Sequence, residues 1–122
     1  MRAVISPVKD LGKKGEDLAV ALCRQKGFIV LQQNFRTPFG EIDIIARDGN
    51  IVVFIEVKAR TGDLYGAPFE AVTRRKREKI TKVAMSYLKR FRKEVPARFD
   101  VISISMKSGN LELEHIQDAF EI

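Results

Sequence analysis

Two acidic residues and one lysine fall on neighbouring segments that have the composition of β-strands, residues 41–47 and 51–58. Asp43 lies on the first segment, and Glu56 and Lys58 lie two residues apart on the second, so they project from the same face of that strand. Carboxylate oxygens and main-chain carbonyls are the ligands that Mg²⁺ prefers. A lysine beside such an ion can stabilise the charge that develops during phosphodiester hydrolysis. The alternative is an ordinary polar strand face on which Glu and Lys form pairs.

A tight hairpin is predicted between the two strands, because Asp48-Gly49-Asn50 supplies residues that readily adopt positive φ angles. With Asp48 and Gly49 at the central turn positions, Glu41 falls directly opposite Glu56. In this register one face of the hairpin is apolar and includes Ile42, Ile44, Ala46, Ile51, Val53, Ile55 and Val57.

The acids of the opposite face, Glu41, Asp43 and Glu56, repel one another at these positions. Water, the cations Lys58 and Arg60, or a bound metal ion could each offset this repulsion. Glu41 itself is open to two interpretations, an additional contact to the ion or a solvated charge at a strand end.

Helices and further strands must position these residues. Residues 10–26 are rich in Ala and Leu and end before Gly27, which predicts a helix. A second helix is predicted over residues 73–93, where Thr73 can cap the start and apolar residues recur at helical spacing. Residues 28–31, 99–104 and 111–116 have strand character, and residues 59–69 a loop composition. The predicted order is α-β-β-β-α-β-β in one α/β domain spanning residues 1–122.

Positive charge is concentrated in the second predicted helix. The chain has a net charge of +6, and residues 73–93 contain ten basic residues against Glu78 as the only acid. A solvated helix face accounts for part of this charge, and the excess favours contact with the phosphates of nucleic acid, with DNA as the expected partner. The candidate contacts are Arg74, Arg75, Lys76 and Arg77 at the helix start, with Arg60 from the second hairpin strand and Arg36 from the loop expected before the hairpin; Arg36 could instead pair with one of the acids.

Composition excludes several other classes of protein. No apolar run approaches the roughly 20 residues that a membrane helix needs, so we expect a cytoplasmic protein without a membrane partner. Cys23 stands alone and is expected to be a small buried hydrophobic group rather than a reactive thiol. A single His115 supports neither a zinc site nor a histidine-based triad, and we expect a structural role for it.

The arrangement of Asp43 and Ile55-Glu56-Val57-Lys58 resembles the signature of the PD-(D/E)XK superfamily of restriction-endonuclease-like nucleases. Further segments resemble the YraN-like family, small bacterial proteins of unassigned function that are similar to archaeal Holliday-junction resolvases. These segments are GEDLA at 15–19, NFR at 34–36, GEIDIIA at 40–46, FIEVKAR at 54–60 and QDAF at 117–120.

The resemblance implies a restriction-endonuclease-like core, a mixed β-sheet flanked by helices, with the site where the second and third core strands bend. It implies Asp43, Glu56 and the Val57 carbonyl as ligands of Mg²⁺, or of Mn²⁺ as a substitute, and Glu16 as a further acid from the first helix. Lys58 would be the catalytic lysine, acting with Asp43 and Glu56. Ile42 replaces the Pro of the superfamily label.

The implied activity is a metal-dependent endonuclease that hydrolyses phosphodiester bonds in branched or processed DNA, and resolvase-like relatives act as homodimers. Two alternatives use the same residues differently. One is a catalytically silent nucleic-acid-binding or adaptor module, and the other is a protein-interaction scaffold on which the acids are surface groups.

Overall fold

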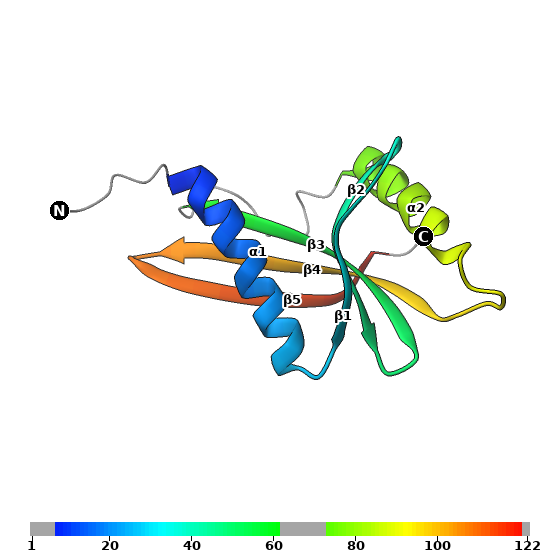
Figure 1. The fold of residues 1–122 in the computed structure, drawn as a ribbon. Helices are drawn as coiled ribbons and strands as arrows, with labels where there is room; N and C mark the ends of the chain where they lie inside the picture. The colour runs from blue at the N-terminus through cyan, green and yellow to red at the C-terminus, as the bar shows by residue number, and fades with distance from the viewer. Residues whose placement is uncertain (1–6, 62–72, 121–122) are drawn as a thin grey trace.

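Five strands form one mixed sheet in the order β1-β2-β3-β4-β5, as the computed structural model shows in Figure 1. The structure describes residues 7–61 and 73–120, so most of the predicted loop at 59–69, with Tyr65, lies outside the described residues. The elements are α1 (Pro7–Gln25), β1 (Ile29–Thr37), β2 (Gly40–Asp48), β3 (Ile51–Thr61), α2 (Arg74–Leu88), β4 (Ala97–Lys107) and β5 (Asn110–Phe120). The predicted α-β-β-β-α-β-β order and the α/β class are confirmed.

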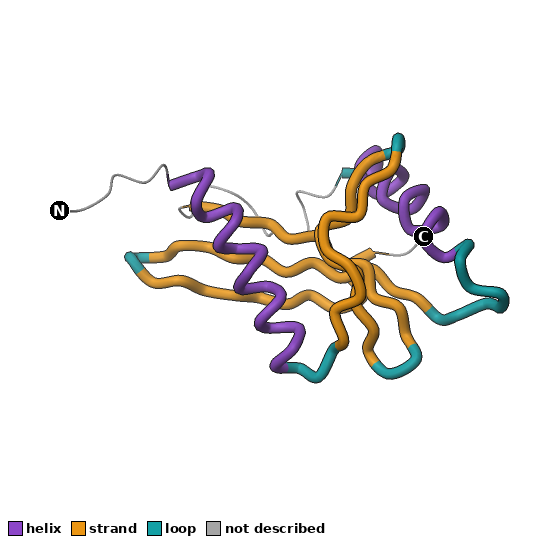
Figure 2. Tube along the Cα trace, in the orientation of Figure 1, coloured by secondary structure: helices purple, strands orange, loops and turns teal. Residues whose placement is uncertain are grey.

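The two helices cover opposite faces of the sheet (Figure 2). β3 and β4 pair in parallel, and all other neighbouring strands pair antiparallel, so the chain between β3 and β4 must cross over, and it does so through α2. Two hydrophobic clusters result. One lies under α1 and contains Val20, Cys23 and Ile102, and the other lies under α2 and contains Val83 and Tyr87.

Cys23 is buried within the cluster under α1, as expected from the sequence. Burial raises the pKa of its thiol to about 11, and the negative charge of Asp100 adds to this effect. A thiol with so high a pKa is hardly ionised at neutral pH, so Cys23 behaves as an apolar core residue.

The β2–β3 turn differs from the prediction by one position. Gly49 and Asn50 form the turn, with Gly49 at a φ of 60°, and Asp48 pairs with Ile51. Asp48 is held at the strand end because its Oδ2 accepts a hydrogen bond from Arg98 Nη1 at 3.0 Å. A contact to a distant strand therefore overrides the local turn preference of Asp-Gly.

The corrected register moves every partner across the hairpin by two residues, so Ile44 pairs with Ile55 and Glu41 is not opposite Glu56. Because the shift is even, most side chains keep the faces predicted for them. Ile42 is the exception: it was expected beside Ile44 but lies in the cluster under α2. The pairing of β2 with β3 ends at Ile44, and the β1–β2 hairpin curves towards α2 (Figure 1).

The helix α2 begins as predicted and ends earlier. Thr73 caps it, since Thr73 Oγ1 accepts a hydrogen bond from the backbone N–H of Lys76 at 3.2 Å. The helix ends at Leu88 instead of residue 93, and the chain then turns so that Phe91 and Val95 pack against the cluster under α2. Only the first part of the basic segment is therefore helical.

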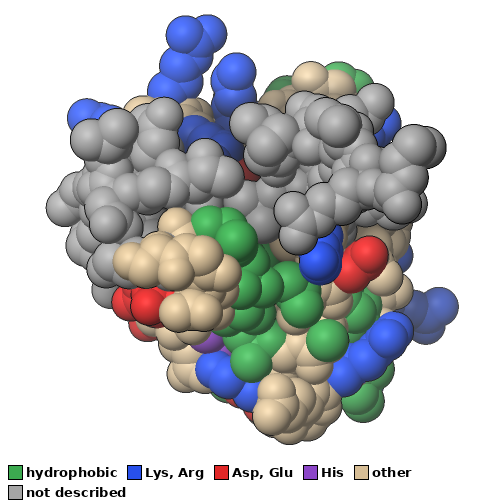
Figure 3. Space-filling model, turned by 90° about the vertical axis from the view of Figure 1, so that its left-hand side faces the viewer, with side chains coloured by type: hydrophobic (Ala, Val, Ile, Leu, Met, Phe, Trp, Pro, Cys, Tyr) green, Lys and Arg blue, Asp and Glu red, His purple; other side chains and the backbone are tan. Residues whose placement is uncertain are grey.

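Apolar side chains are exposed on the β4–β5 hairpin. Met106, Leu111 and Leu113 keep 36%, 37% and 38% of their surface exposed. Hydrophobic side chains gather on the face of the molecule seen in Figure 3. No helix among the described residues is both long and apolar enough to span a membrane.

Candidate functional site

Asp43 and Glu56 are the first residues beyond the end of the β2–β3 pairing, which stops at Ile44 and Ile55. β3 continues alongside β4, where Glu56 pairs with Val101, while β2 continues with β1 alone. The candidate site therefore lies at the divergence of β2 from β3.

Asp43 is bound to the segment that contains Glu56 and Lys58. Its Oδ2 accepts a hydrogen bond of 2.8 Å from the backbone N–H of Val57. This contact joins residues 14 positions apart in the chain and holds the Asp43 carboxylate beside the Val57 peptide group. Asp43, Glu56, Val57 and Lys58 are thus brought together by the structure.

The environment of Asp43 disfavours its ionised form and raises the pKa of its carboxyl to about 7. Burial is the main cause, and the charge of Glu56 is the next; the hydrogen bond from Val57 acts in the opposite direction. Glu16 on α1 and Glu41 on β2 also raise the pKa of Asp43. The charges of the three other predicted acids therefore all disfavour ionisation of this partly buried carboxyl group.

Two lysines neutralise Glu56. Lys76 Nζ lies 2.7 Å from Glu56 Oε1, and Lys58 Nζ lies 3.4 Å from the same oxygen. The pKa of Lys58 is lowered by burial and by the neighbouring ammonium of Lys76. Burial is the largest single effect on Lys76 and acts to lower its pKa as well, but the hydrogen bond to Glu56 and the nearby negative charges of Glu56 and Asp43 together raise the pKa. Lys58 lies where the sequence predicted it, and Lys76 is an addition to the site that the sequence did not reveal.

A divalent cation could be held here by a mixed set of oxygens. Within residues 7–61 and 73–120, no three side chains from Asp, Glu, His or Cys converge closely enough to bind an ion by themselves. Asp43 and Glu56 could supply two carboxylates and Val57 a main-chain carbonyl, with water and phosphate oxygens as the remaining ligands. Repulsion from neighbouring carboxylates contributes to the raised pKa of Asp43, and a cation bound among them would relieve this repulsion. The residues therefore fit the hard cation implied by the resemblance.

A groove of about 530 Å³ lies next to the acids, between the start of β2 and the N-terminal half of α2. Its lining consists of Gly40, Glu41, Thr73, Arg75, Lys76, Lys79 and Ile80. Arg75 and Lys79 are exposed, and both contribute positive charge to the groove. Such a groove suits an extended anion such as a nucleic-acid backbone.

The other predicted phosphate contacts are placed differently. Arg74 pairs with Glu78 at 3.5 Å on the exposed surface, and the Arg77 guanidinium lies over the Phe120 ring, 5.4 Å from its centre. Arg36 Nε donates to Glu41 Oε2 at 3.1 Å, so it pairs with an acid, one of its two predicted roles. Arg60 lies near the end of β3, and its side chain is outside the described part of the structure.

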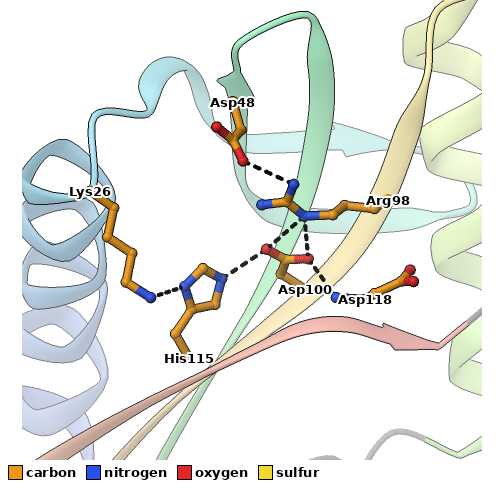
Figure 4. A network of polar contacts seen from close by, with 6 residues as sticks. All are labelled: Lys26, Asp48, Arg98, Asp100, His115 and Asp118. Carbon is orange, nitrogen blue, oxygen red and sulfur yellow. Dashed lines mark hydrogen bonds and ion pairs between the residues drawn. The ribbon is translucent and has the colours of Figure 1, made fainter.

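A second polar cluster lies around β4 on the α1 side of the sheet, and sequence reasoning missed it (Figure 4). Asp100 is fully buried in β4 and accepts hydrogen bonds from Arg98 Nε at 3.0 Å, His115 Nε2 at 2.7 Å and the Asp118 backbone N–H at 2.9 Å. Lys26 Nζ lies 2.6 Å from His115 Nδ1. Because an ammonium group only donates, Nδ1 must accept, and the ring proton on Nε2 is donated to Asp100.

These hydrogen bonds hold the pKa of Asp100 below its ordinary value, although burial alone would raise it. The cluster joins the turn after α1 to β4 and β5, and through Asp48 also to β2, so His115 takes part in a contact between distant segments of the fold. The signal that could have revealed it is a charged residue, Asp100, inside an otherwise apolar strand.

Comparison with known proteins identifies the family. A family model described as uncharacterised protein family UPF0102 matches residues 15–104. A UPF0102 protein of Thermodesulfovibrio yellowstonii is 50% identical over 111 residues, covering 91% of this chain and 96% of the relative. Relatives from Geobacter metallireducens and Clostridium botulinum are 48% and 45% identical, each covering 93% of this chain and 94% and 96% of their own lengths. The chain belongs to the uncharacterised protein family UPF0102.

Proposed function

We propose that this protein is a Mg²⁺-dependent DNA endonuclease of the PD-(D/E)XK superfamily. The observation that carries the proposal is the hydrogen bond between the Val57 N–H and Asp43 Oδ2, with Glu56 and Lys58 on either side of Val57. It places the acid of one strand against the acid and lysine of the next at the divergence of β2 from β3. Mn²⁺ is the expected substitute for Mg²⁺.

Each residue of the site has a distinct role in this proposal. Asp43, Glu56 and the Val57 carbonyl would hold the cation, and Glu16 contributes further negative charge from α1. A cation bound there would supply Lewis-acid chemistry, polarising the scissile phosphate and making a water molecule more acidic. Lys58 lies beside Glu56 and stabilises the charge that develops on the phosphate oxygens. Asp43 and Glu56 also orient the attacking water through hydrogen bonds.

A cleavage assay tests the proposal directly. Four-way junctions, splayed duplexes and linear duplexes are incubated with the protein and Mg²⁺ or Mn²⁺, and we expect metal-dependent products, most abundantly from branched substrates. EDTA should abolish the products, because the two lysines at Glu56 cannot replace a divalent cation in activating water. Binding of DNA without any product in either metal would support the alternative, a catalytically silent nucleic-acid-binding module.

The groove beside α2 predicts how DNA affinity should respond to charge removal. Replacing Arg75 and Lys79 together by Ala should weaken binding and reduce the slope of log affinity against log salt concentration by about 2, one for each lost phosphate contact. Fluorescence anisotropy over a salt series measures both quantities. The matched control replaces Lys89 and Lys93, exposed cations beyond the other end of α2, and removes the same charge. Equal effects of the two double variants would show that the groove is not the DNA-binding surface.

A further inference from the structure

Lys76 contacts the Glu56 carboxylate, one of the two carboxylates that the proposed metal ion would need. The Lys76 ammonium lies 2.7 Å from Glu56 Oε1, a direct charge-assisted hydrogen bond, whereas Lys58 lies at 3.4 Å. The Glu56 side chain is only 12% exposed, so this carboxylate has little water to neutralise it. Lys76 therefore acts as the main counter-ion of Glu56 in the metal-free protein.

We propose that Lys76 is a displaceable counter-ion, which leaves Glu56 when the divalent cation binds and then contacts a backbone phosphate of the nucleic acid. This inference rests on the proposed function. Mg²⁺ coordinates oxygen at about 2.1 Å, and a cation at that distance from Glu56 would repel an ammonium bound to the same carboxylate oxygen. The metal and Lys76 therefore compete for Glu56 Oε1.

The local structure allows the Lys76 side chain to move while its backbone stays in place. The Lys76 N–H is fixed by the Thr73 cap in the first turn of α2, whereas the ammonium is at the end of a flexible four-carbon stem. The side chain is 37% exposed and lines the groove together with Arg75 and Lys79. A displaced ammonium group would therefore remain beside the groove in which a phosphate backbone is expected.

Metal and nucleic acid should consequently favour each other's binding. The metal frees Lys76 for a phosphate, and a phosphate draws Lys76 away from Glu56 and opens the carboxylate to the metal. By thermodynamic linkage each ligand raises the affinity for the other by the same factor. The protein alone would then bind the metal weakly, and the complete site would form only on its substrate.

Calorimetric titration with Mn²⁺ alone tests the displacement. We expect Lys76→Met to bind Mn²⁺ about tenfold more tightly than the wild type, within the range of about 5- to 150-fold that is usual for such coupling. The matched control is Lys79→Met, which removes the same charge from the same groove one turn further along α2. This control should change the affinity far less, because an exposed cation in the groove acts only through screened, longer-range charge. Lys76→Gln, which keeps a hydrogen-bond donor without the charge, should give an intermediate affinity and serves if Lys76→Met does not fold.

Thermal unfolding supplies a second readout that does not depend on activity. Without metal, Lys76→Met should unfold at a lower temperature than the wild type because Glu56 loses its closest partner. Saturating Mn²⁺ should remove most of this difference, because the ion then neutralises Glu56 in both proteins. A metal-independent difference would indicate a purely structural ion pair and would overturn the inference.

The outcomes separate this inference from the function on which it rests. Mn²⁺ binding that requires Asp43, with equal affinities for the wild type and Lys76→Met, would overturn the role of Lys76 and leave the nuclease proposal intact. The absence of Mn²⁺ binding in the wild type and in both Lys76 variants would overturn the metal site itself, and the role of Lys76 with it.

Discussion

Asp43→Asn is expected to reduce the rate of metal-dependent DNA cleavage by about 100- to 1,000-fold, the usual cost of removing one preorganised electrostatic group from an active site. The amide can still accept the hydrogen bond from the Val57 N–H, so the fold should be retained. It cannot supply a carboxylate to the cation, and Mn²⁺ affinity should fall together with activity. Cleavage rates at saturating metal and calorimetric titration measure the two effects.

The same variant should be more stable than the wild type at neutral pH. The pKa of Asp43 is raised to about 7 in the folded protein, from an ordinary value near 3.8, so its ionised form is costly. The free energy of unfolding is therefore highest below the pKa that Asp43 has in the unfolded chain, where the carboxyl is protonated in both states. It falls as the pH rises towards 7, because the folded state retains the proton that the unfolded state releases. We therefore expect the Asn variant to gain about 1–3 kcal/mol over the wild type at pH 7, and this gain to vanish near pH 4.

The control for both effects is Asp17→Asn on the exposed face of α1, which removes one carboxylate outside the site. Denaturant unfolding at pH 4 and pH 7, with the cleavage assay, compares the three proteins. If Asp43→Asn cleaved DNA at the same rate as the wild type, the assignment of Asp43 as a metal ligand would be contradicted. Lower stability of this variant at pH 7 would contradict the electrostatic description of the site.

Asp100→Ala is expected to have the largest effect on stability, a loss of about 3–5 kcal/mol in the free energy of unfolding. Asp100 is fully buried and accepts hydrogen bonds from Arg98, His115 and the Asp118 backbone. Its removal leaves the Arg98 guanidinium, whose side chain is 14% exposed, without its main counter-ion. Breaking one side of a buried pair costs far more than an exposed pair contributes.

The pH dependence of this loss follows from the lowered pKa of Asp100. The pKa of Asp100 is lower in the folded protein than in the unfolded chain, where it is about 3.9. The stabilisation by ionised Asp100 is therefore fully present above the unfolded-state pKa and is lost as the pH falls through the folded-state pKa. The difference between the wild type and Asp100→Ala should therefore be constant from about pH 5 to 8 and should shrink in stronger acid. Urea unfolding at several pH values measures it.

Asp48→Ala is the matched control, because Asp48 contacts the same Arg98 from a position that is 41% exposed. Its replacement should cost less than about 1 kcal/mol. A similar cost for the two variants would show that burial does not determine the energetics of this cluster.

Local sequence patterns were sufficient for the order of the elements. Period-two alternation in the strands and the apolar stripe from Ile80 to Tyr87 depend on residues that are close in the chain, and the sheet and α2 follow them. The turn between β2 and β3 was wrongly predicted because Asp48 bonds to Arg98, 50 residues away. The end of α2 was wrongly predicted because the packing of Phe91 and Val95 interrupts a segment whose periodicity continues.

The candidate site also has some features that the sequence predicted and others that only the tertiary structure shows. The alternation of side chains along β3 by itself placed Glu56 and Lys58 on one face, the predicted hairpin placed Asp43 near them, and the family resemblance implied Glu16 as a further acid. Only the tertiary structure decided that β2 pairs with β3 from Ile44 onwards and not before it, that Ile42 turns to the cluster under α2, and that Lys76 reaches Glu56. These features depend on how α2 packs on the sheet, and such packing is a balance of contacts between distant segments that no local spacing encodes.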